Sequence, residues 1–146
     1  MAGDVLETII TSRKNPVIED LRSLLRSSTR RTARCVVEGW HFLETAAARG
    51  AECLLVVHTP AAAADPRAGE LRQRLHAGGA RLVVVSPYVF EALTQVETPQ
   101  GVLGVLRRPP AASPTVLRDP RLLLVVLDGV QDPGNVGAVL RTAAAA

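Results

Sequence analysis

The sequence has 146 residues, a length that suffices for one ordinary domain or for a small domain with part of another. Its 47% hydrophobic content is typical of a globular chain, and its net charge of +3 permits a nucleic-acid partner without requiring one. No apolar run approaches the roughly 18 to 20 residues of a membrane span, so we expect no contact with a membrane.

The cysteines and histidines exclude two kinds of chemistry. Cys35 and Cys53 form no motif and flank or lie in apolar runs, so we expect two reduced, inert thiols. His41, His58 and His76 lack the spacing of metal ligands, so we expect no metal site. Because the N-terminus also shows no signal-peptide pattern, the sequence predicts a cytoplasmic protein.

Positive charge is concentrated near the N-terminus. Residues 11–36 carry seven basic side chains, opposed only by Glu19 and Asp20, for a net charge of +5. Such a cluster either neutralises RNA phosphates or forms an ordinary solvated face, and both interpretations stay open. The candidate RNA-binding residues are Arg13, Lys14, Arg22, Arg26, Arg30, Arg31 and Arg34.

The first predicted element is a helix that begins near residue 16. Asn15 is a good N-cap and Pro16 suits the first helical position. Val17, Leu21 and Leu24 then recur at helical spacing. After a polar, basic connection, CVVEGW predicts a short strand that ends at the Gly following Glu38.

Helices and strands continue to alternate along the next seventy residues. HFLETAAARG predicts a helix with Gly50 just past its end, and CLLVVH predicts a buried strand. Asp65-Pro66 starts a further helix closed by Gly78-Gly79, and RLVVVS is a third strand. Ser86-Pro87 caps a short helix, and TPQGVLGVL contains a fourth strand. This alternation predicts an α/β sandwich with a largely parallel sheet.

A proline-dense segment then divides the chain. Residues 107–120 contain four prolines and predict a linker between a domain at 1–106 and a second region at 121–146. RLLLVVLD predicts the first strand of a new sheet, and we expect a helix to begin at or just after Asn135.

The loop DGVQDPGNVG joins that strand to that helix. Asp128 follows a buried strand, where ligand sites of α/β sheets gather, and Asn135 can cap a helix whose free N–H groups attract anions. Local physics alone favours an ordinary strand–helix turn, with Arg141 as a solvated cation. The loop is neither a Walker A nor a G-x-G-x-x-G phosphate loop.

Two sets of residues resemble one known family. LDGVQDPGNVGAVLRTA resembles the first signature motif of the SpoU/TrmH family of RNA ribose 2′-O-methyltransferases, of the SPOUT class, whose catalytic domain is a knotted α/β fold. ITSRKNPVIEDLRSL, Glu38-Gly39 and the segment TPQG at 98–101 are similar to the family's N-terminal substrate-binding domain, which has an L30e/L7Ae-like fold. The resemblance covers roughly residues 9–143 and implies an α/β protein: an L30e/L7Ae-like sandwich domain followed by the first strand–loop–helix of a SPOUT methyltransferase domain.

The resemblance implies roles for two residues of the motif. Arg141 corresponds to the arginine that activates or positions the ribose 2′-hydroxyl, and Asn135 to the asparagine that organises the loop and the active site. A hydroxyl is a weak nucleophile that needs a base or strong orientation, whereas arginine is normally protonated. Orientation of the hydroxyl or phosphate binding is therefore as good an account of Arg141 as base catalysis.

The resemblance also implies the cofactor, the partner and a limit. The cofactor is S-adenosylmethionine and the substrate is RNA, with ribosomal RNA preferred and tRNA left open. Two further family motifs, which build the cofactor pocket and much of the homodimer interface, do not occur in these residues. We therefore expect a truncated chain without methyl-transfer activity. The alternative is a non-catalytic, L30e-like RNA-binding module.

Overall fold

The computed structural model describes residues 8–26, 32–94, 96–110 and 113–145. The chain divides into two compact units, Met1–Pro110 and Ala111–Ala146, which are described here separately as unit 1 and unit 2. Arg30 and Arg31 lie outside the described residues. Within the described ranges, every helix is too short or too polar to cross a bilayer.

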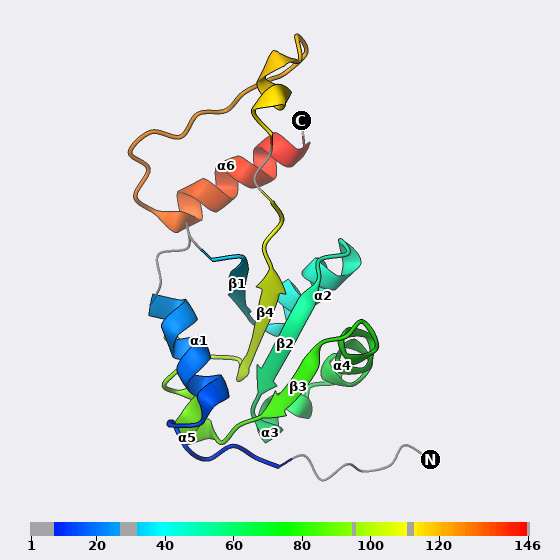
Figure 1. The fold of residues 1–146 in the computed structure, drawn as a ribbon, viewed down its shortest axis with the longest axis vertical. Coiled ribbons are helices and arrows are strands. Elements are labelled where there is room, and N and C mark those ends of the chain that lie inside the picture. The colour runs from blue at the N-terminus through cyan, green and yellow to red at the C-terminus, as the bar shows by residue number, and fades with distance from the viewer. Residues whose placement is uncertain (1–7, 27–31, 95, 111–112, 146) are drawn as a thin grey trace. The chain divides into compact units, whose positions relative to one another are not determined.

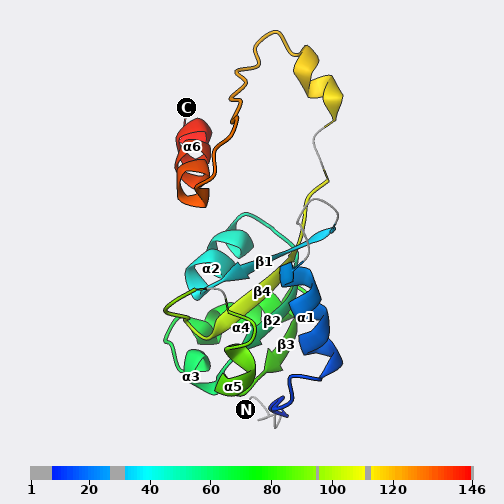
Figure 2. The same cartoon turned by 90° about the vertical axis from the view of Figure 1, so that its left-hand side faces the viewer.

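Unit 1 is a four-stranded sheet with helices on both faces (Figures 1 and 2). The strand order is β1-β4-β2-β3. The strands are β1 (Arg34–Glu38), β2 (Cys53–His58), β3 (Arg81–Val84) and β4 (Val102–Arg107). The helices are α1 (Pro16–Arg26), α2 (Trp40–Ala48), α3 (Pro60–Ala63), α4 (Ala68–Ala77) and α5 (Pro87–Phe90).

The sheet is mixed, so the prediction of a largely parallel sheet is wrong. Only β2 and β3 pair in parallel, whereas β4 pairs antiparallel with both β1 and β2. Helical crossovers do make β1, β2 and β3 run in one direction. Strand β4 lies between β1 and β2 and runs in the opposite direction. Only the four-residue α5 and a loop connect it to β3, so β4 starts at the end of the sheet where β3 finishes.

Two apolar clusters form the core, one on each face of the sheet. On one face, Ile18 and Leu21 of α1 pack with α5 and with Leu103 and Val105 of β4. On the other face, α2, α3 and α4 pack against the sheet, and Val102 of β4 joins them. Successive side chains of a strand point to opposite faces of the sheet, so β4 contributes side chains to both clusters. This central strand is therefore buried on both sides.

A glycine in β4 lets α2 approach the sheet closely. A Cβ placed on Gly104 would overlap the side chain of Leu43, which is fully buried. We expect Gly104→Ala to lower the free energy of unfolding by about 1–3 kcal/mol, the usual range for an overpacked core. Urea unfolding followed by circular dichroism measures it. Gly69→Ala in α4 is the matched control: open space surrounds its added methyl. A Gly104→Ala chain as stable as the control would contradict this packing.

Most element boundaries in unit 1 follow the predicted signals. Asn15 caps α1, since its Oδ1 accepts from the Val17 N–H at 2.9 Å. Ser86 caps α5 in the same way, accepting from the Val89 N–H at 3.3 Å. One local prediction is wrong, because helix α4 begins at Ala68 rather than at Asp65-Pro66. The short helix α3 precedes it and was not predicted. Thr59 provides the N-cap of α3, and Pro60 its first residue.

Unit 2 contains the short 3₁₀ helix η1 (Pro114–Arg118) and the helix α6 (Pro133–Ala145). The predicted strand at 121–128 is not a strand among the described residues: its backbone has no ladder partner, and Leu123 and Val126 are largely exposed. A strand requires a neighbour for its N–H and C=O groups, which sequence pattern alone does not supply. The helix prediction at Asn135 is also shifted, because α6 starts at Pro133.

Candidate functional site

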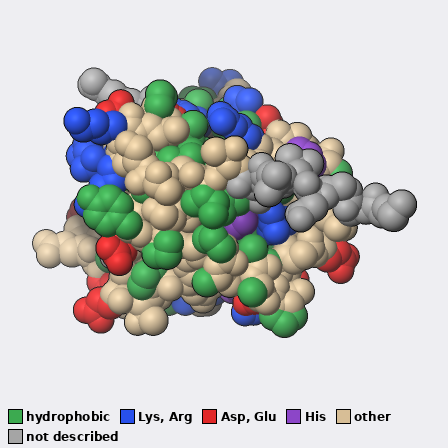
Figure 3. Space-filling view, turned by 90° about the horizontal axis from the view of Figure 1, so that it is seen from below, with side chains coloured by type: hydrophobic (Ala, Val, Ile, Leu, Met, Phe, Trp, Pro, Cys, Tyr) green, Lys and Arg blue, Asp and Glu red, His purple; other side chains and the backbone are tan. Residues whose placement is uncertain are grey.

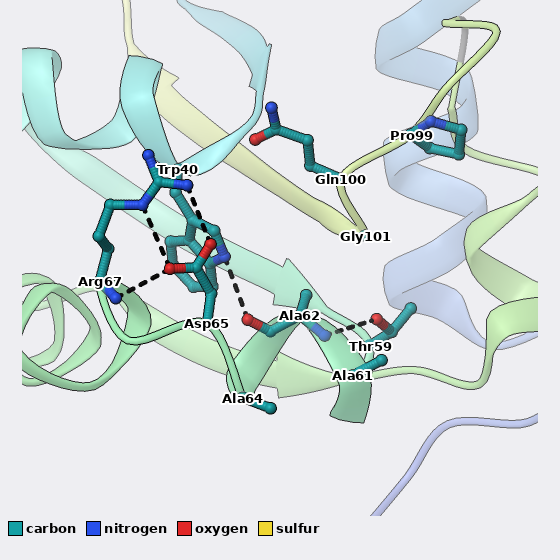
Figure 4. Close-up of a pocket in the computed structure, with 10 residues that line it drawn as sticks. All are labelled: Trp40, Thr59, Ala61, Ala62, Ala64, Asp65, Arg67, Pro99, Gln100 and Gly101. Carbon is teal, nitrogen blue, oxygen red and sulfur yellow. Dashed lines mark hydrogen bonds and ion pairs between the residues drawn. The ribbon is translucent and has the colours of Figure 1, made fainter.

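A pocket of about 600 Å³ lies in unit 1 at the edge where β1 and β2 end and β4 begins (Figure 4). Three segments line it: the start of α2 with Trp40, residues 59–67 after β2, and the segment from Pro99 to Gly101 before β4. Carboxyl ends of strands are the usual place for ligand sites in α/β folds. The pocket also includes residues 99–101 of the segment at 98–101 and adjoins Gly39, two of the places that resemble the family's substrate-binding domain in sequence.

The backbone of the segment before β4 holds the pocket together. The Thr59 N–H donates to the Gly101 carbonyl at 2.9 Å, and the Gly39 N–H donates to the Val102 carbonyl at 3.0 Å. Gly101 has a φ of 73°, which a residue with a side chain rarely adopts, and a Cβ there would lie 2.7 Å from Thr59 Oγ1. Gly101 therefore has to be a glycine for the backbone to approach Thr59 this closely, although the two residues are about forty positions apart in sequence.

Trp40 and Thr59 form the rigid wall of the pocket. The indole is 2% exposed, and its Nε1–H donates to the Ala62 carbonyl at 3.1 Å. Thr59 Oγ1 accepts from the Ala62 N–H at 3.2 Å. The only donor of the indole is thus satisfied within the protein, and Thr59 Oγ1 accepts a bond from the backbone. Trp40 shapes the wall rather than offering a free donor to a ligand.

An ion pair forms the polar side of the pocket. The Arg67 guanidinium forms a bidentate ion pair with Asp65: Nε donates to Oδ1 at 3.2 Å, and Nη2 donates to Oδ2 at 3.0 Å. The Arg67 backbone N–H also donates to Oδ1 at 2.9 Å. These side-chain and backbone hydrogen bonds lower the pKa of Asp65, so its carboxylate stays ionised at neutral pH. Gln100, whose side chain lies against Gly39, adds an amide with both a donor and an acceptor.

A second contact holds the loop that carries Gln100. The Thr94 hydroxyl donates to Glu38 Oε1 at 2.8 Å, which ties the start of the loop to the end of β1. Glu38-Gly39 therefore shapes the pocket from two sides: Glu38 holds the loop, and the missing Cβ of Gly39 makes room for Gln100. This gives a physical reason for that dipeptide at the strand end.

Among the described residues, the predicted basic cluster does not form one uniform cationic surface. Arg34 forms a bidentate ion pair with Asp20, in which Nη1 donates to Oδ2 at 2.7 Å and Nη2 donates to Oδ1 at 2.9 Å. These hydrogen bonds lower the pKa of Asp20. Arg13 donates two hydrogen bonds to the backbone carbonyl of Tyr88 in α5. Lys14 and Arg26 are exposed, and Arg22 is half-buried on α1. The other two, Arg30 and Arg31, lie outside the described residues.

Asp132, not Asn135, caps α6 in unit 2. Asp132 Oδ1 accepts from the Gly134 N–H at 2.8 Å, and its carbonyl accepts from the Val136 N–H at 3.2 Å. Asp132-Pro133 is a stronger start signal, because Asp is an N-cap residue and Pro suits the first helical position. Asn135 therefore lies within the first turn and is exposed, which leaves its side chain available to a ligand.

Arg141 lies about 1.7 turns further along α6 and is exposed. At 3.6 residues per turn, six residues place Asn135 and Arg141 about 120° apart around the helix, so they do not share one face. The Arg141 guanidinium lies beside Gly137, where an added Cβ would be 3.3 Å from Nη1. No group of His, Cys, Asp and Glu within the described residues could hold a metal ion.

The comparisons with known proteins agree with both units. Residues 15–104 match the family described as MRM3-like substrate binding domain. An uncharacterized tRNA/rRNA methyltransferase of Synechocystis is 34% identical, over 93% of this chain and 48% of that protein. The 23S rRNA (guanosine(2553)-2′-O)-methyltransferase RlmP of Bacillus subtilis is 29% identical, over 94% of this chain and 50% of its own length.

A solved structure extends the similarity to the fold. The AdoMet-bound rRNA methyltransferase from Sinorhizobium meliloti has a TM-score of 0.69 and 26% identity, over 94% of this chain and 51% of that chain. The fold and its motifs are therefore those of the SPOUT class. The chain belongs to the SpoU/TrmH family of RNA 2′-O-methyltransferases and contains its MRM3-like substrate binding domain. It spans about half the length of the curated relatives it matches.

Proposed function

We propose that the protein is an RNA ribose 2′-O-methyltransferase that uses S-adenosylmethionine and acts on ribosomal RNA, with unit 1 as its RNA-binding, L30e/L7Ae-like domain. One observation carries the proposal: a single chain joins the family's substrate-binding domain to a segment, Asp128 to Ala143, similar to its first catalytic motif. Several relatives are named as rRNA methyltransferases, which favours rRNA over tRNA. We expect the whole protein to act in the cytoplasm and, from the family resemblance, to form a homodimer.

The pocket in unit 1 supports RNA binding. Gln100 offers an amide, and the Asp65–Arg67 pair offers acceptors and donors, beside the apolar wall at Trp40. Proteins recognise RNA sequence mostly through unpaired bases, which need such hydrogen-bonding groups next to an apolar surface. The chemistry of the pocket therefore suits an unpaired region of the substrate better than a helix.

Arg141 and Asn135 supply the chemistry that this chain contributes. An exposed guanidinium can orient a ribose hydroxyl through its planar donors or bind the adjacent phosphate. Asn135 offers an amide donor and an amide acceptor on a different face of α6. Because arginine is normally protonated, we assign Arg141 the positioning of the 2′-hydroxyl rather than removal of its proton.

S-adenosylmethionine supplies the methyl group when bound, but the described residues of unit 2 do not fit it. The hollow between residues 123–125 and α6 measures about 410 Å³ and is lined by Leu, Val, Ala and one Thr. No charged or amide side chain lines that hollow, whereas the cofactor carries an amino acid, a sulfonium and an adenine. We therefore derive no reaction step through these residues and the cofactor.

Deletion of the encoding gene tests the proposed activity. We expect one 2′-O-methylated nucleotide to disappear from ribosomal RNA, because a free 2′-hydroxyl restores alkaline cleavage at that position. Mapping alkaline cleavage of rRNA and tRNA from the two strains measures it, and restoring the gene on a plasmid is the control. An unchanged pattern in both RNAs would contradict the enzyme and favour the non-catalytic RNA-binding module.

A further inference from the structure

Arg13 and Tyr88 form a stacked pair at the end of β3. The Arg13 guanidinium carbon lies 3.8 Å from the centre of the Tyr88 ring. Its Nε and Nη2 both donate to the backbone carbonyl of Tyr88, at 3.1 and 2.8 Å. The two residues are seventy-five positions apart, so the pair fixes the segment before α1 onto α5. The hydrogen bonds hold the guanidinium plane in place on the ring.

The pair keeps its positive charge. Its acceptor is a neutral carbonyl, and the described residues place no carboxylate in an ion pair with Arg13. Arg34 differs, because Asp20 neutralises it directly. A cation that is held without being neutralised still attracts an anion or the π-face of a further ring.

The surroundings leave the pair open to a ligand. Tyr88 is 59% exposed even with Arg13 on one side of its ring, and the neighbouring Lys14 is exposed. The strand-like contact of Ile10 with β3 makes the support rigid: its N–H donates to the Val84 carbonyl, and its carbonyl accepts from Ser86. The view from below in Figure 3 shows green hydrophobic side chains beside blue Lys and Arg side chains on this end of the molecule.

We propose that Arg13 and Tyr88 form a stacking platform for an unpaired nucleobase of the RNA substrate, with Lys14 contacting its phosphate. Unpaired RNA bases bind by stacking on tyrosine rings and arginine planes, and a nearby lysine then neutralises the backbone. A duplex hides its base faces and would gain nothing from the platform. This inference rests on the proposed function only in taking RNA as the ligand, and it is independent of methyl transfer.

Tyr88→Leu tests the platform in the full 146-residue chain. The variant keeps the backbone carbonyl that binds Arg13, and it keeps every charge. Loss of one stacked base should weaken binding of a single-stranded RNA oligonucleotide about 5- to 150-fold, and the salt dependence should stay unchanged. Tyr88→Phe keeps the ring and should retain affinity. Phe42→Leu is the matched control, since that ring is 60% exposed on α2 and no Lys or Arg among the described residues lies over it.

Each outcome decides the inference. It is supported if Tyr88→Leu weakens binding to the single strand but not to a duplex. In addition, the fluorescence of 2-aminopurine in a bound oligonucleotide should be quenched by the natural chain and no longer quenched by Tyr88→Leu. It is overturned if Tyr88→Leu binds like the natural chain, if Phe42→Leu or Tyr88→Phe weakens binding as much, or if single strand and duplex are affected equally. RNA binding with unchanged Tyr88→Leu affinity sinks only the platform, whereas no RNA binding by the natural chain sinks the proposed RNA-binding role as well.

Discussion

A chain with alanine in place of Trp40 is expected to lose about 3–5 kcal/mol of its free energy of unfolding, the usual cost of truncating a fully buried aromatic residue. Trp40 is the largest fully buried side chain in the described structure. It packs in the cluster formed by α2, α3, α4 and one face of the sheet, and its ring lies 6.4 Å from that of His58. Alanine would leave a cavity beneath the pocket and leave the Ala62 carbonyl without its indole donor.

Urea unfolding followed by circular dichroism measures this loss, since Trp40 is the only tryptophan and its fluorescence disappears with it. Trp40→Phe separates the two contributions: it keeps most of the packing but abandons the hydrogen bond to Ala62, and should cost about 1–3 kcal/mol. Phe42→Ala is the control, because that ring is exposed and should change stability by less than about 0.5 kcal/mol. A Trp40→Ala chain no less stable than the Phe42→Ala control would contradict the described core.

Local signals predicted most of unit 1, whereas contacts between distant segments escaped prediction. Asn15 and Ser86 are helix caps in the structure because their side chains bond to N–H groups two or three residues away, which the sequence displays directly. The reversed direction of β4 depends on which strand it pairs with, and pairing is not local. Helix α3 escaped notice because four residues are too few to show a helical period.

The candidate site divides in the same way. Asn135 and Arg141 could be recognised as candidate residues because the motif that resembles the family is a run of consecutive residues. Asp65, Arg67 and Thr59 show no such pattern. They reach the pocket because the segment after β2 packs against Gly101, just before β4. Gly39 and Gly101 were visible signals, since both lie in the recognised signatures. The pairing of Arg13 with Tyr88 could not be foreseen, because charge clustering along the sequence says nothing about a partner seventy-five residues away.

Arg141→Ala should abolish most of the proposed methyl transfer. A group that positions or activates a nucleophile typically contributes a factor of about 10² to 10⁴ in rate. Arg141 is exposed on α6, and Ala is a better helix former, so the substitution should leave the fold intact. We expect the gene carrying Arg141→Ala to fail to restore the missing 2′-O-methyl group in the deletion strain, although the protein accumulates to the normal level.

Two further variants separate the possible roles of this arginine. Arg141→Lys keeps a cation but loses the planar set of donors, so it should stay inactive if the guanidinium orients the hydroxyl and recover activity if it only attracts a phosphate. Arg121→Ala is the control: that side chain is 90% exposed in the same unit, and its loss should change the rate by no more than about twofold. Full activity of Arg141→Ala would remove Arg141 from the site and leave Asn135 as the motif's remaining candidate, because only these two residues of the motif carry assigned roles in handling the ribose.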